Sequence, residues 1–168
     1  MATDVHITGY RMGALADVLK LHTSYYGDQW GFGLQFETLV ASEMARFLTA
    51  FDPALDQFLV AYDKQGTCLG SVSVNGSRES PGALASLRWF IVDRRCVGKG
   101  LGRRLLTQVL AHCDAQGVDE LRLSTFSGLD AARALYESAG FSLVEELDSN
   151  PWSGGVREQR FVRNRPLA

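Results

Sequence analysis

The chain has 168 residues, of which 46% are hydrophobic and 21% are charged, and its formal net charge is −2 at pH 7. This composition is typical of a compact globular domain and excludes a disordered or fibrous chain. A net charge near zero also disfavours a general nucleic-acid-binding protein. We therefore expect one domain over residues 1–168 that binds no nucleic acid.

Cysteine usage and the longest apolar run predict where the protein resides. Cys68, Cys96 and Cys113 are widely spaced and form no C-x-x-C pair, so neither a disulfide framework nor a zinc site is predicted. The longest apolar run, residues 58–62, is far shorter than the ~18 residues that a membrane span requires. We therefore expect a cytoplasmic protein with no bound metal and no membrane association.

Hydrophobic periodicity predicts the elements of the chain in order. Apolar residues at helical spacing predict helices over residues 12–21, 35–51, 101–116 and 130–138. Strands are predicted over residues 5–8, 57–62, 68–74, 84–92, 121–126, 141–147 and 155–162. A loop rich in aromatic residues and glycine is expected over residues 25–33, between the first two helices. This mixture of strands and helices predicts an α/β or α+β fold with a single sheet.

The most informative segment is the turn between the predicted strand over residues 84–92 and the helix that follows it. Gly98, Gly100 and Gly102 alternate in this turn. Glycine backbones adopt tight conformations that bring several N–H groups together, and the helix N-terminus adds unpaired donors and a positive dipole. Residues 88–104 also carry six basic residues against a single acid. The segment is therefore predicted to bind a phosphate-bearing ligand.

Two common phosphate-binding motifs do not fit this turn. Lys99 is followed by Gly100, where a Walker A loop has Ser or Thr, and Asp93 occupies the position of that loop's first glycine. When the dinucleotide-binding pattern G-x-G-x-x-G is counted from Gly98, Arg103 falls at its third glycine. The sequence therefore favours neither a nucleoside triphosphatase nor a dinucleotide-binding enzyme.

The glycine turn resembles the acetyl-CoA loop of the GNAT superfamily of N-acetyltransferases, whose pattern is Arg/Gln-x-x-Gly-x-Gly/Ala. Residues 97–102 match the usual Arg-Gly-Lys-Gly-Ile-Gly form, except that Val97 replaces the Arg or Gln. Residues 131–141 are similar to a second signature of the family, Ala-x-x-x-Tyr-x-x-x-Gly-Phe. Within the family, the chain is most similar to the acetyltransferase half of MarR-GNAT fusion proteins, on the basis of Tyr25, Tyr26-Gly27, Phe36-Glu37, Phe47-Leu48, Phe51-Asp52-Pro53 and Leu87-Arg88-Trp89.

This resemblance implies a GNAT-type fold, with a single mixed, largely antiparallel sheet, helices on both faces and a splayed central strand pair. It also implies that an amine attacks the thioester of acetyl-CoA directly, with a backbone N–H near Ile91 as donor to the oxyanion and Tyr136 as general acid. The residues expected to bind acetyl-CoA are Phe90, Ile91, Val92, Val97, Gly98, Lys99, Gly100, Leu101, Gly102 and Arg103. Those expected to bind the acceptor are Tyr25, Trp30, Phe32 and Glu37.

The sequence leaves the acceptor and the general base open. The expected acceptor is a small-molecule or peptide amine, and homodimers are common among similar proteins. Glu37, Glu43 and a water wire are alternatives for the base, whereas Cys96 is not expected to act as a nucleophile because no histidine lies nearby in the sequence. Leu129 replaces an Asn that often contacts the cofactor. A non-catalytic module that senses acyl-CoA is the alternative function.

Overall fold

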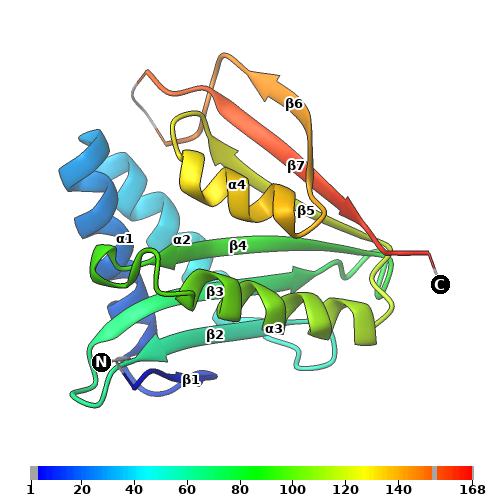
Figure 1. Ribbon diagram of the computed structural model, residues 1–168, viewed down its shortest axis with the longest axis horizontal. Coiled ribbons are helices and arrows are strands. Elements are labelled where there is room, and N and C mark those ends of the chain that lie inside the picture. The colour runs from blue at the N-terminus through cyan, green and yellow to red at the C-terminus, as the bar shows by residue number, and fades with distance from the viewer. Residues whose placement is uncertain (1–3, 153–154, 168) are drawn as a thin grey trace.

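The computed structural model describes residues 4–152 and 155–167 (Figure 1). The sheet and the helices follow one another in a mixed order along the chain. The elements are β1 (His6–Thr8), α1 (Ala14–Trp30), α2 (Leu34–Thr49), β2 (Gln57–Tyr62), β3 (Cys68–Gly76), β4 (Leu84–Val92), the short 3-10 helix η1 (Arg94–Cys96), α3 (Leu101–Ala115), β5 (Glu120–Phe126), α4 (Asp130–Ser138), β6 (Ser142–Leu147) and β7 (Glu158–Asn164).

The strands form a seven-stranded sheet in the order β1-β2-β3-β4-β5-β7-β6. All neighbouring pairs are antiparallel except β4 and β5, which are parallel. These two strands pair only where Leu84–Ser86 faces Glu120–Arg122, and both continue beyond that point without further pairing. The prediction of a single mixed, largely antiparallel sheet with a splayed central strand pair is confirmed.

Helices cover both faces of the sheet: α3 and α4 lie in front of it in Figure 1, and α1 and α2 lie behind it. Successive side chains of a strand point to opposite faces. In β2, Leu59 and Ala61 therefore belong to the core beneath α3, whereas Phe58 and Val60 belong to the core beneath α1 and α2. The sheet thus separates two hydrophobic cores. In the described residues, no helix is long and apolar enough to cross a membrane.

The aromatic loop predicted over residues 25–33 is wrong in its first part, because α1 continues to Trp30. Tyr26 packs against Phe36 and Phe126, with ring centroids 5.2 and 5.6 Å away. This packing outweighs the poor helix propensity of the neighbouring glycine. The helix ends at Gly31, whose φ of 66° is left-handed and whose N–H bonds back into the last turn.

The last strand also differs from its prediction over residues 155–162. It begins at Glu158 and continues to Asn164, two residues beyond the predicted end. The reason is its pairing with β5, which runs without interruption from Phe126 opposite Glu158 to Glu120 opposite Asn164. β7 therefore lies between β5 and the edge strand β6.

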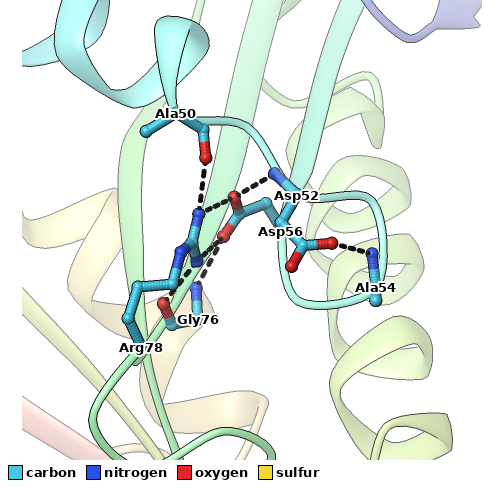
Figure 2. Close-up of polar contacts among 6 residues, drawn as sticks. All are labelled: Ala50, Asp52, Ala54, Asp56, Gly76 and Arg78. Carbon is cyan, nitrogen blue, oxygen red and sulfur yellow. Dashed lines mark hydrogen bonds and ion pairs between the residues drawn. The ribbon is translucent and has the colours of Figure 1, made fainter.

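A buried carboxylate ties three elements together on the α2 side of β2 and β3 (Figure 2). Asp56 is 2% exposed, and its two oxygens accept hydrogen bonds from the backbone N–H groups of Asp52 and Gly76, both at 2.9 Å. Arg78 donates to both oxygens, at 2.9 and 2.6 Å, and also to the carbonyl of Ala50 at 2.8 Å. The cluster thereby joins the end of α2, the start of β2 and the end of β3.

We expect Asp56→Asn to lower the free energy of unfolding at pH 7 by about 2–3 kcal/mol, because an amide cannot replace a carboxylate that accepts four hydrogen bonds. Burial by itself raises the pKa of Asp56, but the hydrogen bonds from Arg78, Asp52 and Gly76 hold it below its usual value. A carboxyl with a lowered pKa stabilises the fold above its unfolded pKa and loses that contribution as the pH falls through its folded pKa. In urea denaturation, the difference between the two proteins should therefore shrink below about pH 4.

The matched control is Asp4→Asn. Asp4 pairs with Lys64, but the two side chains are 73% and 70% exposed. Loss of such a surface pair should change the free energy of unfolding by less than about 0.5 kcal/mol. An Asp56→Asn protein as stable at pH 7 as the control would show that the buried cluster does not stabilise the fold.

Candidate active site

A cavity of about 1340 Å³ opens where β4 and β5 diverge. Because the parallel pairing stops at Ser86 and Arg122, no strand fills the space between the two strands beyond that point. Its walls come from α1 and α2 on one side of the sheet, from the glycine turn and α4 on the other, and from β4, β5 and β7. The cavity therefore reaches both faces of the sheet.

A β-bulge interrupts β4 at the edge of this cavity. Ser71 of β3 faces Ile91 of β4, and Ser73 faces Arg88. Between these two pairs, β4 therefore has one more residue than β3. Trp89, within the bulge, has a φ of 49°, and it is the single non-glycine residue with positive φ in the described part of the chain. A left-handed backbone is rare for a bulky residue and persists only where its surroundings enforce it, most often at functional sites. Here the Ser71 hydroxyl holds the bulge by donating to the carbonyl of Trp89 at 2.7 Å.

The bulge turns the backbone N–H of Phe90 toward the cavity. The carbonyl of Trp89 faces Ser71 on β3, and the C=O and N–H of a trans peptide point in opposite directions, so the N–H of Phe90 points away from β3. Ile91 instead pairs with Ser71, and the N–H of Asp93, two residues on, donates to a β3 carbonyl at 2.8 Å. Backbone groups alternate in direction along a strand, so those of Ile91 face β3 and those of Phe90 face the opening.

The glycine turn borders the cavity on the α3 side. Gly98 and Gly100 have φ values of 77° and 81°, and a Cβ added to either would meet no atom within 4 Å. Gly100 is also the N-cap of α3 and has no side chain to cap it, so the first N–H groups of the helix are left for a ligand. Arg103, in the first turn of α3, lines the cavity. Open space, free N–H groups and a nearby cation together fit a phosphate group.

Gly102, the third glycine, has a packing role. A Cβ there would lie 3.2 Å from a methyl group of Leu135 and 3.3 Å from the ring of Phe90. Its absence lets the first turn of α3 approach both α4 and β4. The glycine turn, the bulge and α4 are therefore held around the same end of the cavity.

Tyr136 lies in α4 and lines the cavity, with 5% of its surface exposed. Its ring centroid is 5.6 Å from that of Phe90 and 5.9 Å from that of Phe141. Burial, and secondarily the nearby Tyr26, raises the pKa of Tyr136 above its usual range. Among residues 4–152 and 155–167, the hydroxyl has no hydrogen-bond partner. The phenol is therefore protonated at neutral pH and free to donate.

Most of the residues predicted to bind acetyl-CoA line this cavity, but not all of them. Lys99 does not line it, and Leu101 is 3% exposed in the core beneath α3. Their neighbours Gly98, Gly100 and Gly102 do line it. The predicted residues that line it are Phe90, Ile91, Val92, Val97, Gly98, Gly100, Gly102 and Arg103.

Of the residues predicted to bind the acceptor, only Tyr25 lines the cavity. Trp30 packs on Gly128 instead, where an added Cβ would lie 2.5 Å from the indole. Phe32 is 8% exposed within the aromatic core, and Glu37 is exposed to solvent on α2. For Trp30, the extension of α1 explains the difference, because the predicted aromatic loop is helical up to this residue.

Several polar residues of the cavity were not singled out as site residues by the sequence. His22 on α1 and Arg88 on β4 line it, and Arg88 forms a hydrogen-bonded ion pair with Glu43 of α2. In the sequence, His22 is one member of an apolar helical stripe, and Arg88 is one of many basic residues near the glycine turn. Periodicity in the sequence predicts which face of a helix or strand carries a side chain, but it does not predict that this face lines a cavity.

Comparison with known proteins agrees with this geometry. Residues 15–141 match the model of the acetyltransferase (GNAT) family. An uncharacterised N-acetyltransferase of Schizosaccharomyces pombe is 28% identical over 149 residues, which cover 89% of this chain and 90% of the relative. A mycothiol acetyltransferase of Beutenbergia cavernae is 38% identical over 96 residues, which cover 57% of this chain but only 31% of the relative.

Solved structures show the same fold. A GNAT-family acetyltransferase of Staphylococcus aureus superposes with a TM-score of 0.75 at 16% identity, covering 96% of this chain and 99% of that one. A GCN5-related N-acetyltransferase of Kribbella flavida gives a TM-score of 0.72 at 23% identity, covering 95% and 97%. The chain belongs to the acetyltransferase (GNAT) family. The prediction that it is an acyltransferase enzyme is thereby confirmed at the level of the family.

We expect Ser71→Ala to lower the free energy of unfolding by about 1 kcal/mol, because the Trp89 carbonyl would lose the hydrogen bond that holds the bulge. Ser42→Ala is the matched control, since the hydroxyl of Ser42 also donates to a backbone carbonyl but lies exposed on α2. Urea denaturation of both variants measures the difference. Equal stability of the two variants would mean that Ser71 does not hold the strained backbone in place.

Proposed function

We propose that the protein transfers an acetyl group from acetyl-CoA to a primary amine of a small molecule, an amino acid or a peptide by direct attack. The observation that carries this proposal is the bulge in β4, which aims the N–H of Phe90 into the cavity that the glycine turn borders. The family supports acyl transfer in general. The amine acceptor and the use of acetyl-CoA are the specific parts of the proposal.

In this proposal the phosphates of acetyl-CoA lie on the glycine turn. The N–H groups at Gly98, Gly100 and the start of α3 donate to them, with Arg103 as the adjacent cation. The backbone of Phe90 and Val92, on the side of β4 that β5 leaves unpaired, binds the pantetheine arm. When bound, acetyl-CoA supplies an activated thioester, and this part of the chain holds it in place.

The chain's own groups then stabilise and complete the transfer. As the amine nitrogen bonds to the carbonyl carbon, the N–H of Phe90 donates to the oxygen that becomes negative. We assign this role to Phe90 rather than to Ile91, because Ile91 pairs with β3. As the carbon–sulfur bond breaks, Tyr136 gives its proton to the thiolate, whose parent thiol has a pKa of ~8.5.

A covalent route through Cys96 does not fit the cavity. Cys96 is 5% exposed, and burial raises the pKa of its thiol, which disfavours the thiolate that a nucleophile needs. The proposed reaction therefore forms no acyl-enzyme. A cytoplasmic location, a homodimer and the narrower similarity to MarR-GNAT fusions stay predictions.

Gly100→Glu tests the cofactor and its site by calorimetric titration with acetyl-CoA. The substitution would put a carboxylate into the open space where the phosphates are proposed to lie, so binding should be lost. Gly13→Glu is the matched control, because Gly13 is the N-cap of α1, has a φ of 93° and is equally open, but does not line the cavity. It should carry similar backbone strain and bind acetyl-CoA as the wild type does.

Two outcomes of this titration would contradict the proposal. A folded wild type that does not bind acetyl-CoA would remove the proposed cosubstrate. Tight binding by Gly100→Glu would move the phosphates away from the glycine turn.

Tyr136→Phe tests the proposed acid. It should lower kcat by about 10²-fold and leave the affinity for acetyl-CoA unchanged, since the ring still packs against Phe90 while the proton donor is gone. Thiol release from acetyl-CoA, measured across a panel of amines, gives the rate. Tyr10→Phe, at an exposed position outside the cavity, is the control. Wild-type activity in the Tyr136→Phe protein would exclude the phenol as the acid.

A further inference from the structure

One buried base in the cavity has no role in the steps above. His22, on α1, lines the cavity and is 4% exposed. Its Nδ1 lies 2.8 Å from the carbonyl oxygen of Val18. A carbonyl only accepts hydrogen bonds, so Nδ1 carries the proton and Nε2 keeps its lone pair. Within the described ranges, Nε2 has no partner of its own.

The carboxylates that line the cavity are engaged with arginines. Glu43 pairs with Arg88 across the gap between α2 and β4. The other three also form ion pairs with arginine side chains. These pairs are Glu120 with Arg122, Glu145 with Arg160 and Glu158 with Arg160. Arg103 is a cation, and the remaining titratable side chains of the cavity other than His22 are phenols and a thiol, which are weak acids: Tyr25, Tyr26, Tyr136 and Cys96. His22 is thus the cavity's neutral basic side chain with an available lone pair.

His22 also lines the same cavity as Phe90 and Tyr136, the groups proposed to act on the thioester. On α1 it precedes Tyr26 by one turn, with ring centroids 6.1 Å apart, and Tyr26 lines the same cavity as Tyr136. Tyr136 in turn contacts Phe90, the proposed oxyanion donor. His22 lies on α1 and Tyr136 on α4, helices that cover opposite faces of the sheet, and both residues line the cavity. Two different residues of the same cavity can therefore handle the proton of the attacking amine and the proton for the departing thiolate.

We propose that His22 is the general base of the acetyl transfer and takes the proton of the attacking amine on Nε2. This inference rests on the proposed function. The bond from the amine nitrogen to the carbonyl carbon forms, the N–H proton passes to His22, the carbon–sulfur bond breaks and Tyr136 protonates the thiolate. His22 then returns its proton to solvent, and Tyr136 regains one. Burial, opposed by the Val18 carbonyl, lowers the pKa of His22 to about 4, so the free imidazole is neutral at physiological pH.

Chemical rescue of His22→Ala tests the assignment. Thiol release is measured with an amine that the wild type acetylates, and kcat should fall by about 10²-fold with unchanged affinity for acetyl-CoA. Added imidazole should then raise the rate, because the truncated side chain leaves space for it beside the cavity. 1,2,4-Triazole, a ring of the same size but much lower basicity, should raise it far less.

Two further variants complete the test. His112→Ala is the matched control, since His112 lies on α3 outside the cavity and also has a buried Nε2 without a partner in the described structure. It should keep the wild-type rate and be insensitive to imidazole. His22→Gln keeps a polar side chain without a basic nitrogen, so it should lose the same rate even if His22→Ala does not fold.

Each outcome bears on one of the two proposals. A rate loss that imidazole does not reverse, or that both rings reverse equally, would overturn the assignment and make His22 a packing residue. Full activity in His22→Gln would overturn it as well, while leaving acetyl transfer intact. A wild type that binds acetyl-CoA but acetylates no amine would overturn the proposed function and this inference with it.

Discussion

The early end of the pairing between β4 and β5 is the constraint on which the rest of the structure depends. Only three residues of each strand pair with the other strand, yet both strands continue beyond that point and line a cavity. Unpaired backbone groups inside a protein are costly unless another partner satisfies them. Each strand therefore relies on its other neighbour: β4 follows β3 to Val92, and β5 follows β7 along its full length. The opening persists because β4 and β5 each keep a paired neighbour on their other side.

The bulge in β4 adapts the strand to this opening without disturbing the core. Ala85 and Leu87 face the core beneath α3, and after the bulge Phe90 and Val92 face that same core. The extra residue thus shifts the alternation by one, and Trp89 enters the opposite core, where its ring lies 5.4 Å from that of Phe47. The strained φ of Trp89 is the cost of this shift, and its consequence is an N–H directed at the opening.

The sequence predicted the parts of the molecule that local spacing determines. The alternation at Gly98, Gly100 and Gly102 predicted a ligand-binding turn, and the structure places open space and an uncapped helix end there. The largely apolar segment after the break at residues 80–82 also predicted strand 84–92, but its sequence has no signal for a bulge. The choice between Phe90 and Ile91 therefore required the register with β3.

The wall of the cavity formed by α1 and α2 was harder to predict, for a physical reason. Whether Trp30 or Tyr25 faces the cavity depends on how far α1 continues past Gly27, and that depends on the aromatic packing of Tyr26 against residues far along the chain. Propensity favours a break at glycine, but tertiary burial overrides it. His22 could be placed on an apolar stripe, but the sequence carried no sign that Val18 would fix its tautomer.

In the proposed reaction, the donor and the acceptor bind on opposite faces of the sheet. The glycine turn and Tyr136 belong to the face that α3 and α4 cover, whereas His22 and the pair of Glu43 with Arg88 belong to the face of α1 and α2. In the proposed reaction, the first face holds the donor and the second receives the amine. In this proposal, substitutions on α1 and α2 can therefore alter the acceptor without moving the cofactor, because β4 lies between the two faces.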